Sequence, residues 1–363
     1  MKTARLIQLS PEADPKAVKG SLTSLGQWPS ALKDSAGVTC AFSLDPSSVP
    51  VSEALLRAIE GVTAVLGTTS PHPLLDQQAA RVVEVAGYRF QDPTAGPLLI
   101  SGPCSVETEA LAFEVAEQVA AAGGQWLRGG AYKPRTSPYA FQGKGEEGLR
   151  WLRAAADSQG LKVVTEALSE QSAQRVADWS DVLQIGTRNM QNFALLKAVG
   201  ATGRPALLKR GLCATVEEWL LAGEYLRAHG AEAVIFCERG LRSFDVQTRN
   251  LLDLGAVALL KHSYQLPVVV DPSHAAGRRD LIAPLARAAL AVGADGVMVE
   301  AHPNAAEAMS DGPQALNSAE LLALGEELRL LSPQLKSHET EADELNLSIA
   351  LEQRADKLAT RSQ

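Results

Sequence analysis

From about residue 97 onward, short apolar runs alternate with longer amphipathic stretches. Near-continuous apolar runs are typical of strands that are covered on both faces, as they are in a parallel sheet. The stretches between them, such as 108–122 and 145–159, space their apolar residues in the way that predicts helices. The predicted strands lie at 98–102, 126–130, 161–167, 182–186, 206–211, 233–240, 267–274 and 296–302.

Eight strand and helix pairs in succession predict an α/β fold of the (β/α)₈ TIM barrel type, with an open doubly wound sheet as the alternative. We place this barrel at 97–335. The segment 71–96 starts in a proline-rich break in the chain and is predicted to be a linker. Residues 336–363 are predicted to form a C-terminal helical tail that is either solvated or packed against another subunit.

Residues 1–70 follow a different pattern. The expected elements are a strand at 4–9, a helix at 14–25, extended segments at 28–33 and 38–44, a helix at 51–60 and a strand at 62–66. The order βαββαβ is typical of a ferredoxin-like fold. We therefore expect a small ferredoxin-like α+β domain before the barrel.

Length and composition agree with this division. A chain of 363 residues suits one barrel of about 250 residues and a smaller domain. The formal net charge of −8 argues against the broad basic surface that binds nucleic acid. Neither a signal peptide nor an apolar run of membrane-spanning length is apparent, so we expect a cytoplasmic protein without a membrane partner. The four scattered cysteines form no CxxC pair and are most simply reduced thiols.

Cations follow many of the predicted strands, at the end of the barrel where active sites lie. Some of them should pair with the carboxylates of Glu166, Glu238 or Asp271, which follow strands of their own. The surplus positive charge predicts two anion sites, because Arg and Lys are the usual partners of phosphate and carboxylate groups. The cations are Arg128, Lys133, Arg135, Arg188, Lys209, Arg210 and Arg239.

Four potential metal ligands come from strands that are neighbours in a closed barrel. Cys104 follows the first strand, His274 the seventh, and Glu300 and Asp311 the eighth. One thiolate, one imidazole and two carboxylates suit a divalent first-row metal such as manganese, iron, cobalt, copper or zinc. Their spacing fits no short motif, and on its own Cys104 is more simply a buried thiol and His274 the cap of a turn. Closure of the barrel is what favours a metal site.

A set of motifs in these strands and loops resembles 3-deoxy-D-arabino-heptulosonate 7-phosphate (DAHP) synthase. The resemblance covers about 97–330 and is greatest to the short microbial class related to 3-deoxy-D-manno-octulosonate (KDO) 8-phosphate synthase. It implies a metal-dependent aldol-type condensation of phosphoenolpyruvate with erythrose 4-phosphate, the first step of the shikimate pathway. The motifs are GPCS (102–105), RGGAYKPRTSPYAFQG (128–143), QIGTRNMQN (184–192), LLKRG (207–211), CERG (237–240), DPSH (271–274) and VEAHPN (299–304).

The resemblance also implies a role for each matching residue. The metal ligands would be Cys104, His274, Glu300 and Asp311, with Mn²⁺ as the expected metal and Fe²⁺, Co²⁺, Zn²⁺ or Cu²⁺ as alternatives. Phosphoenolpyruvate would be held by Arg128, Lys133, Arg188, Lys209 and Arg239. The aldose phosphate would be held by Arg135 and Thr136, with Asp271 near the aldose hydroxyls.

Two side chains are candidates for direct roles in the chemistry. Lys133 lies between the two anion sites in the motif and is assigned proton delivery to the new hydroxyl. Glu166 either orients the attacking water or Lys209, or forms a salt bridge to a neighbouring cation. One departure from the family pattern is Thr187, where alanine is expected between Gly186 and Arg188; the added hydroxyl should be tolerated.

Several alternatives remain open at this stage. The sister KDO 8-phosphate synthase uses arabinose 5-phosphate and has Lys-Ala-Asn-Arg-Ser where this chain has Lys133-Pro134-Arg135-Thr136-Ser137, which favours the four-carbon aldose. A Schiff-base aldolase would use Lys209, and a non-catalytic binding barrel would need no metal ligands. Residues 1–70 resemble the regulatory domain of a subgroup inhibited by an aromatic amino acid (Tyr or Phe here), although a pure interaction module is possible. A homodimer or homotetramer is implied by the resemblance alone.

Overall fold

The protein is described by a computed structural model that covers residues 5–34, 37–45, 48–49, 51–67, 70–79, 81–92, 94–133, 137 and 139–331. The chain divides into two compact units, Met1–Asp76 and Gln77–Gln363, which we describe separately. Arg135, Thr136 and the predicted tail at 336–363 lie outside the described residues.

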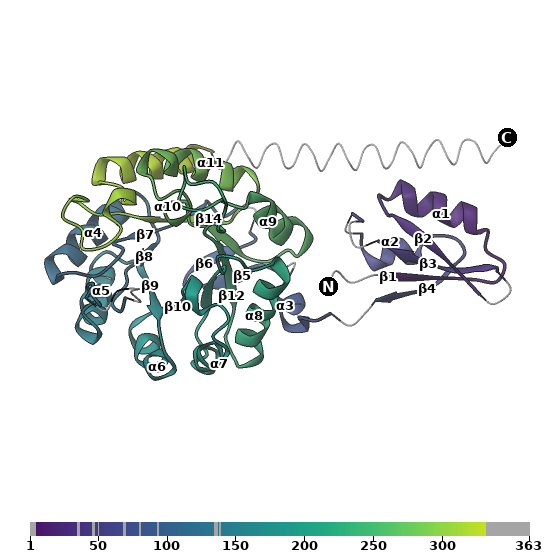
Figure 1. Ribbon diagram of the computed structural model, residues 1–363, viewed down its shortest axis with the longest axis horizontal. Coiled ribbons are helices and arrows are strands. Elements are labelled where there is room, and N and C mark those ends of the chain that lie inside the picture. Colours follow the sequence, from purple (N-terminus) through teal and green to yellow (C-terminus); the bar gives the residue numbers. More distant parts are fainter. Residues whose placement is uncertain are drawn as a thin grey trace. The chain divides into compact units, whose positions relative to one another are not determined.

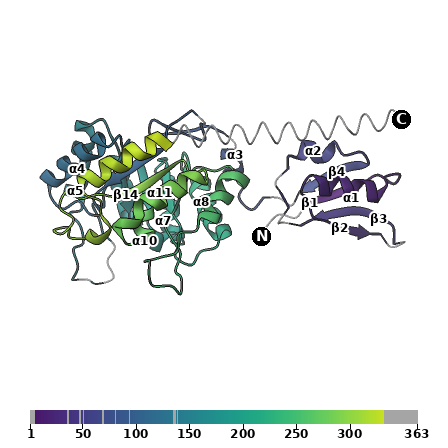
Figure 2. The same cartoon turned by 90° about the horizontal axis from the view of Figure 1, so that it is seen from above.

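The N-terminal unit is a four-stranded antiparallel sheet with two helices against one face (Figure 2). The strand order β4-β1-β3-β2 and the chain order βαββαβ confirm the ferredoxin-like prediction. Ile7 and Phe42, which lie opposite each other in the sheet, pack with Leu22 and Leu56 of the helices in one core. The elements are β1 Arg5–Leu9, α1 Pro15–Ser24, β2 Pro29–Lys33, β3 Thr39–Leu44, α2 Glu53–Arg57 and β4 Val62–Gly67.

The second unit is a closed barrel of eight parallel strands, and each predicted strand is present. Figure 1 shows barrel strands with helices packed around them. The strands are β7 Leu98–Gly102, β8 Trp126–Arg128, β9 Lys162–Ala167, β10 Val182–Ile185, β11 Ala206–Lys209, β12 Val234–Glu238, β13 Val268–Val270 and β14 Gly296–Glu300. The last strand pairs with the first, so that Glu300 lies opposite Gly102. This closure brings the ends of β13, β14 and β7 together.

Helices connect the strands and form the outer layer. The main ones are α4 Glu109–Ala121, α5 Glu146–Ser158, α6 Glu170–Trp179, α7 Phe193–Ala201, α8 Val216–Ala228, α9 Leu254–Ala258 and α11 Ile282–Ala291. The short α10 Pro272–Ala276 is instead buried at the end of β13. Their starts follow ordinary capping chemistry. The Thr215 side chain, for example, accepts a hydrogen bond from the backbone nitrogen of Glu218, and the Glu218 side chain accepts one from the backbone nitrogen of Thr215. Together the two bonds form a capping box at the start of α8. A closing helix at 318–331 ends the described chain.

The predicted linker, 71–96, contains ordered structure. It includes α3 Pro73–Gln78 and a hairpin of β5 Val83–Val85 and β6 Tyr88–Phe90. Val85 and Phe90 are buried in the same core as the starts of the barrel strands, and the Phe90 ring meets Trp126 edge-on at 5.9 Å between centroids. The hairpin therefore closes the N-terminal end of the barrel, and this part of the predicted linker belongs to the barrel.

Candidate active site

A pocket of about 580 Å³ opens at the C-terminal ends of the strands. Its polar lining includes Glu166, Gln184, His274 and Asp311. Seven cations also line it: Arg128, Lys133, Arg188, Lys209, Arg239, Arg242 and Arg249. Five of these seven were predicted from the sequence. Arg242 and Arg249 were not; both lie in the long loop after β12, whose path no periodic pattern in the sequence reveals.

Arg210, the remaining described cation of the predicted set, points away from this pocket. Its guanidinium is buried against the carboxylates of Glu238 and Asp253, at 2.9 Å from each, and lies over the ring of Trp219. For Arg210 and Glu238 the simpler prediction of a structural ion pair is therefore the one that the geometry favours.

The four candidate metal ligands converge at one side of the pocket. Ligand atoms of Cys104, Glu300 and Asp311 lie within 4.8 Å of one another. The Nε2 atom of His274 lies 3.4 Å from Glu300 Oε1 and 3.9 Å from Asp311 Oδ2. Two closely spaced carboxylates, a thiol and an imidazole nitrogen are a donor set that fits a divalent first-row metal.

Electrostatics in this cluster favour a bound cation. Burial raises the pKa of the Cys104 thiol to about 12, and the neighbouring Glu300 charge adds to the effect. Burial also opposes ionisation of Asp311, but the charge of His274 and the hydrogen bond from Cys104 outweigh it and hold the Asp311 pKa at about 2. His274 and Arg128 likewise lower the pKa of buried Glu300. Both carboxylates are therefore ionised at neutral pH, whereas the thiol must lose its proton when a metal binds.

Neighbouring side chains hold the candidate ligands in place. Arg128 donates to Glu300 Oε1 at 3.2 Å, and Gln314 donates to Glu300 Oε2 at 2.6 Å. Arg249 donates to Asp311 Oδ1 at 3.2 Å. Such contacts around a metal site orient the ligands and tune their basicity.

The backbone contributes to the position of Asp311. This residue has a left-handed conformation with φ of 52°, which aspartate tolerates better than most residue types. The 3₁₀ turn Gly312–Gln314 follows directly and carries the Gln314 side chain to Glu300. The loop after β14 thus supplies one candidate ligand and a contact to another.

Lys133 links the metal cluster to the pocket. Its Nζ atom lies 2.8 Å from the carbonyl oxygen of Cys104 and 3.0 Å from the Cys104 sulfur. A Cβ atom at Gly130 would lie 2.7 Å from the Lys133 side chain and 2.9 Å from the Cys104 carbonyl oxygen. The glycine at this position of the RGG motif therefore leaves room for Lys133 to approach Cys104.

Glu166 lines the pocket, and its Oε2 atom accepts a hydrogen bond from the Gln184 side chain at 3.2 Å. Its carboxylate lies so close to the chain at Gly186 that a Cβ atom there would be 2.0 Å from Glu166 Oε1. The glycine of the QIG motif is therefore explained by the space that this carboxylate takes.

His302 follows Glu300 in the same motif but does not join the ligand cluster. Its Nδ1 atom accepts a hydrogen bond from the backbone of Asn304, and its Nε2 atom lies 3.8 Å from a carboxylate oxygen of Glu107.

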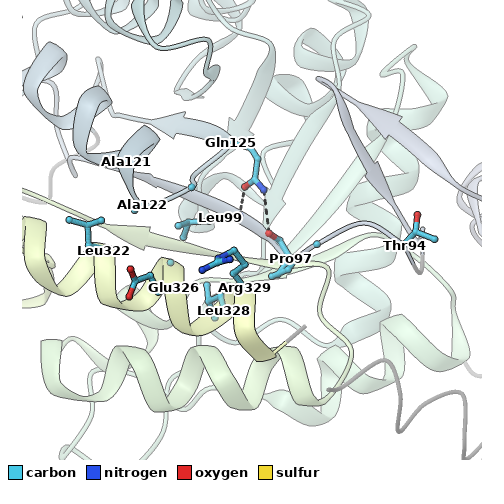
Figure 3. A pocket seen from close by; sticks show the side chains of 13 residues that line it. Thr94, Pro97, Leu99, Ala121, Ala122, Gln125, Leu322, Glu326, Leu328 and Arg329 are labelled. Carbon is cyan, nitrogen blue, oxygen red and sulfur yellow. Dashed lines mark hydrogen bonds between the residues drawn. The ribbon is translucent and has the colours of Figure 1, made fainter. Parts of the chain in front are cut away.

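A larger cavity, of about 670 Å³, lies at the opposite, N-terminal end of the barrel strands. Figure 3 shows Gln125 bonded to the backbone there, with Glu326 and Arg329 of the closing helix on the other side. Its walls are otherwise mainly small or apolar and carry no group of metal ligands. The pocket at the C-terminal ends, where barrels of this kind have their active sites, is therefore the better candidate.

Among the described residues, no helix combines the length and apolar character needed to cross a bilayer.

Comparison with known proteins identifies relatives of the barrel. A phospho-2-dehydro-3-deoxyheptonate aldolase of Thermotoga maritima is 51% identical over 237 residues, covering 65% of this chain and 70% of the relative. A 2-dehydro-3-deoxyphosphooctonate aldolase of Acidithiobacillus ferrooxidans is 34% identical over 236 residues, covering 60% and 83%.

Solved structures agree with this assignment. The crystal structure of the Thermotoga maritima phospho-2-dehydro-3-deoxyheptonate aldolase (DAHP synthase) matches with a TM-score of 0.71 at 38% identity, covering 92% of this chain and 98% of that one. A truncated form of the DAHP synthase of that organism has a TM-score of 0.68 at 42% identity, covering 74% and 98%.

The family model of the DAHP synthetase I family matches residues 94–337, which include all eight barrel strands. The matched region contains every candidate ligand and every pocket cation described above. The chain therefore belongs to the DAHP synthetase I family.

Proposed function

We propose that this chain is a 3-deoxy-7-phosphoheptulonate synthase, which condenses phosphoenolpyruvate with erythrose 4-phosphate to give DAHP and phosphate. The observation that carries the proposal is the convergence of four metal-ligand side chains beside a pocket lined by seven cations. The heptonate relative is 51% identical, against 34% for the octonate relative, which favours the four-carbon aldose over arabinose 5-phosphate.

Cys104, His274, Glu300 and Asp311 would hold the metal. A divalent ion there supplies a Lewis acid that polarises the aldehyde carbonyl, a contribution of several kcal/mol. We propose Mn²⁺ as the metal. Fe²⁺, Co²⁺, Zn²⁺ and Cu²⁺ are alternatives, because the mixed donor set also suits them.

Phosphoenolpyruvate would lie against Arg128, Lys133, Arg188, Lys209 and Arg239. Guanidinium groups can hold carboxylate or phosphate with two hydrogen bonds, and the lysines add compact positive charge. The phosphate of the aldose is assigned to Arg135 and Thr136, which lie outside the described residues. Holding two anionic substrates in the reacting geometry can contribute roughly 7–11 kcal/mol.

The protein's own groups would then guide the bond changes. Carbon 3 of phosphoenolpyruvate attacks the aldehyde carbon, and the electron pair of the carbonyl bond moves to its oxygen. Lys133 is assigned delivery of a proton to this oxygen, since its ammonium group lies at the edge of the metal cluster. Water, oriented by Glu166, adds at carbon 2, which the attack leaves electron-deficient, and loses one proton to solvent to give a hemiketal phosphate. The bond between carbon 2 and the phosphate oxygen then breaks, the hydroxyl proton passes to the departing phosphate, and the keto group forms.

The test is phosphate release from phosphoenolpyruvate, measured with each aldose phosphate before and after treatment with EDTA. Activity with erythrose 4-phosphate that is lost with EDTA and restored by Mn²⁺ supports the proposal. Activity with arabinose 5-phosphate would assign the chain to the sister reaction. Trapping of an adduct by borohydride would instead indicate a Schiff-base aldolase that uses Lys209.

For the N-terminal unit we propose a regulatory role, with Tyr or Phe as the effector. Its separate core and ferredoxin-like fold support a domain that binds a ligand of its own. A homodimer or homotetramer and a cytoplasmic location also remain proposals, which sedimentation analysis and cell fractionation would test.

A further inference from the structure

Asp271 occupies the junction between the candidate metal site and the anion pocket. It follows β13 directly and caps the start of α10, where its Oδ1 atom accepts a hydrogen bond from the backbone nitrogen of His274 at 2.9 Å. Its Oδ2 atom accepts from the ring Nδ1 of His274 at 2.7 Å and from Lys209 Nζ at 2.6 Å. One carboxylate oxygen therefore contacts both a candidate metal ligand and a pocket cation.

These contacts leave little of Asp271 for a substrate. Its side chain is 1% exposed, and three donors from the protein already use most of the roughly four acceptor positions of a carboxylate. The geometry therefore favours a positioning role for Asp271 over a contact with the aldose hydroxyls.

The contact with His274 determines which ring nitrogen faces the metal. Because Nδ1 donates its proton to Asp271, Nε2 is the nitrogen available for a metal, and it is the one that faces Glu300 and Asp311. Carboxylates that accept from the second nitrogen of a ligand histidine fix its tautomer and ring orientation and raise its basicity.

The contact with Lys209 reaches the substrate side. Lys209 ends β11 and lines the pocket, but its side chain is only 5% exposed, so its ammonium group depends on Asp271 for its position. A buried ammonium group without this partner would be costly to keep charged.

We propose that Asp271 is a positioning residue that joins the two halves of the site, holding His274 for the metal and Lys209 for phosphoenolpyruvate with one carboxylate oxygen. This inference rests on the proposed function for the identity of the bound anion, but the link to His274 stands on the geometry alone. It predicts that one substitution at Asp271 weakens both metal binding and phosphoenolpyruvate binding.

Asp271→Asn is the informative variant, because it keeps the shape and removes one acceptor oxygen. An amide that directs its oxygen to His274 Nδ1 and Lys209 turns its NH₂ group toward the backbone nitrogen of His274, which is also a donor. The opposite orientation turns the NH₂ group toward the ring and the ammonium group. Neither orientation satisfies all three donors.

Asp253→Asn is the matched control. Asp253 also caps a helix with one oxygen, toward Ala256 at 2.9 Å, and pairs with a cation through the other, toward Arg210 at 2.9 Å. It does not line the pocket and does not contact a candidate metal ligand.

The experiment uses the full chain, stripped of metal with EDTA and titrated with Co²⁺ while the thiolate-to-cobalt absorption band is followed. The KM for phosphoenolpyruvate and for erythrose 4-phosphate is then measured in the reconstituted protein. Asp271→Asn should weaken Co²⁺ binding about 10–100-fold, as loss of such a partner typically does. It should also raise the KM for phosphoenolpyruvate more than that for the aldose. Asp253→Asn should leave all three values unchanged.

Two outcomes would overturn the inference. One is unchanged Co²⁺ affinity with a raised KM for erythrose 4-phosphate alone, which would assign Asp271 to the aldose. The other is seen without any variant, by ¹⁵N-histidine NMR of the Zn²⁺-bound wild type, where Nδ1 of His274 must remain protonated. An unprotonated or metal-bound Nδ1 would contradict the link even if the Asn variant fails to fold.

Failure of the proposed function would give a different result. Wild-type protein that binds Co²⁺ but releases no phosphate with either aldose would remove the assigned reaction. The comparison of Co²⁺ affinity between the wild type and Asp271→Asn would still decide whether Asp271 positions His274.

Discussion

Two opposing influences act on the ionisation of the Cys104 thiol. Its burial keeps the thiol protonated, with a pKa of about 12, whereas a metal ligand must be a thiolate. The Lys133 ammonium group 3.0 Å from the sulfur offsets part of the cost of forming that thiolate. Metal binding must supply the rest of this free energy, so ionisation of the thiol and binding of the metal are coupled.

Replacing this thiol should therefore remove the metal. We expect Cys104→Ala to lower Co²⁺ and Mn²⁺ affinity strongly and to lower kcat about 10³-fold, because a Lewis acid contribution of several kcal/mol is lost. Circular dichroism should show an intact barrel. Cys213→Ala, which removes an exposed thiol, is the control and should change neither quantity. Full turnover by Cys104→Ala in metal-free buffer would exclude the metal role.

Gly186 gives a second test at this scale, because its backbone angles are ones that alanine adopts readily. The strain in Gly186→Ala would come from the Glu166 carboxylate, 2.0 Å from the new methyl group. We expect the displaced carboxylate to lower kcat by up to about 10²-fold, as a misplaced catalytic group can, without changing metal affinity.

The control for this variant is Gly96→Ala, where no atom lies within 4 Å of the added methyl group. Combining Gly186→Ala with Glu166→Ala provides the decisive comparison. If the glycine acts only through Glu166, the double variant should be no slower than Glu166→Ala alone. Additive losses would show that Gly186 matters for another reason.

Among the elements, strand geometry explains which of the predicted cations line the pocket. Lys209 and Arg210 are consecutive, and consecutive side chains at a strand point to opposite faces. Lys209 accordingly lines the pocket, while Arg210 packs toward Trp219 and α8. The sequence predicted the strand, but treating both residues as rim cations ignored this alternation.

The hairpin of β5 and β6 was missed for a different reason. Each strand has only three residues, and the polar Glu84 and Arg89 interrupt the apolar positions, so neither forms a run that is recognisable as a strand. Val85 and Phe90 become buried only because they cover the open end of the barrel. Such a contact depends on the finished fold and is not encoded in local periodicity.

Phe90 provides a test of this closure. Because it is fully buried against Trp126, we expect Phe90→Ala to lower the free energy of unfolding of the barrel by about 3–5 kcal/mol. Chemical denaturation followed by tryptophan fluorescence measures the change. Phe244→Ala, at a fully exposed side chain, should have almost no effect on stability. Equal stability of the two variants would mean that the hairpin does not seal the barrel.

At the scale of the whole molecule, ring closure is what makes the site. The four candidate ligands are spread over more than two hundred residues of the chain, and their meeting follows from the pairing of β14 with β7. The sequence predicted this because the strands were recognisable. It did not predict Arg249, since the path of the long loop after β12, which carries Arg249 to Asp311, has no periodic pattern to reveal it.

The separate core of the N-terminal unit leads to the last prediction. If residues 1–70 bind an aromatic effector and the barrel performs the chemistry, then a chain of residues 71–363 should keep its metal affinity and its kcat. Tyr or Phe should inhibit only the full chain. An effector at about 100 times its Kd stabilises the unit that binds it by about 2.7 kcal/mol, so a thermal shift should accompany inhibition.

Phosphate release and thermal melting of both chains, with and without each amino acid, provide the measurement. Retaining residues 71–96 is essential to the design, because Phe90 and Val85 belong to the barrel core and their loss would destabilise the enzyme for an unrelated reason. A thermal shift that persists in the shortened chain would place the effector site on the barrel. Loss of activity in a shortened chain that still melts cooperatively and binds Co²⁺ would mean that the N-terminal unit takes part in catalysis, contrary to a purely regulatory role.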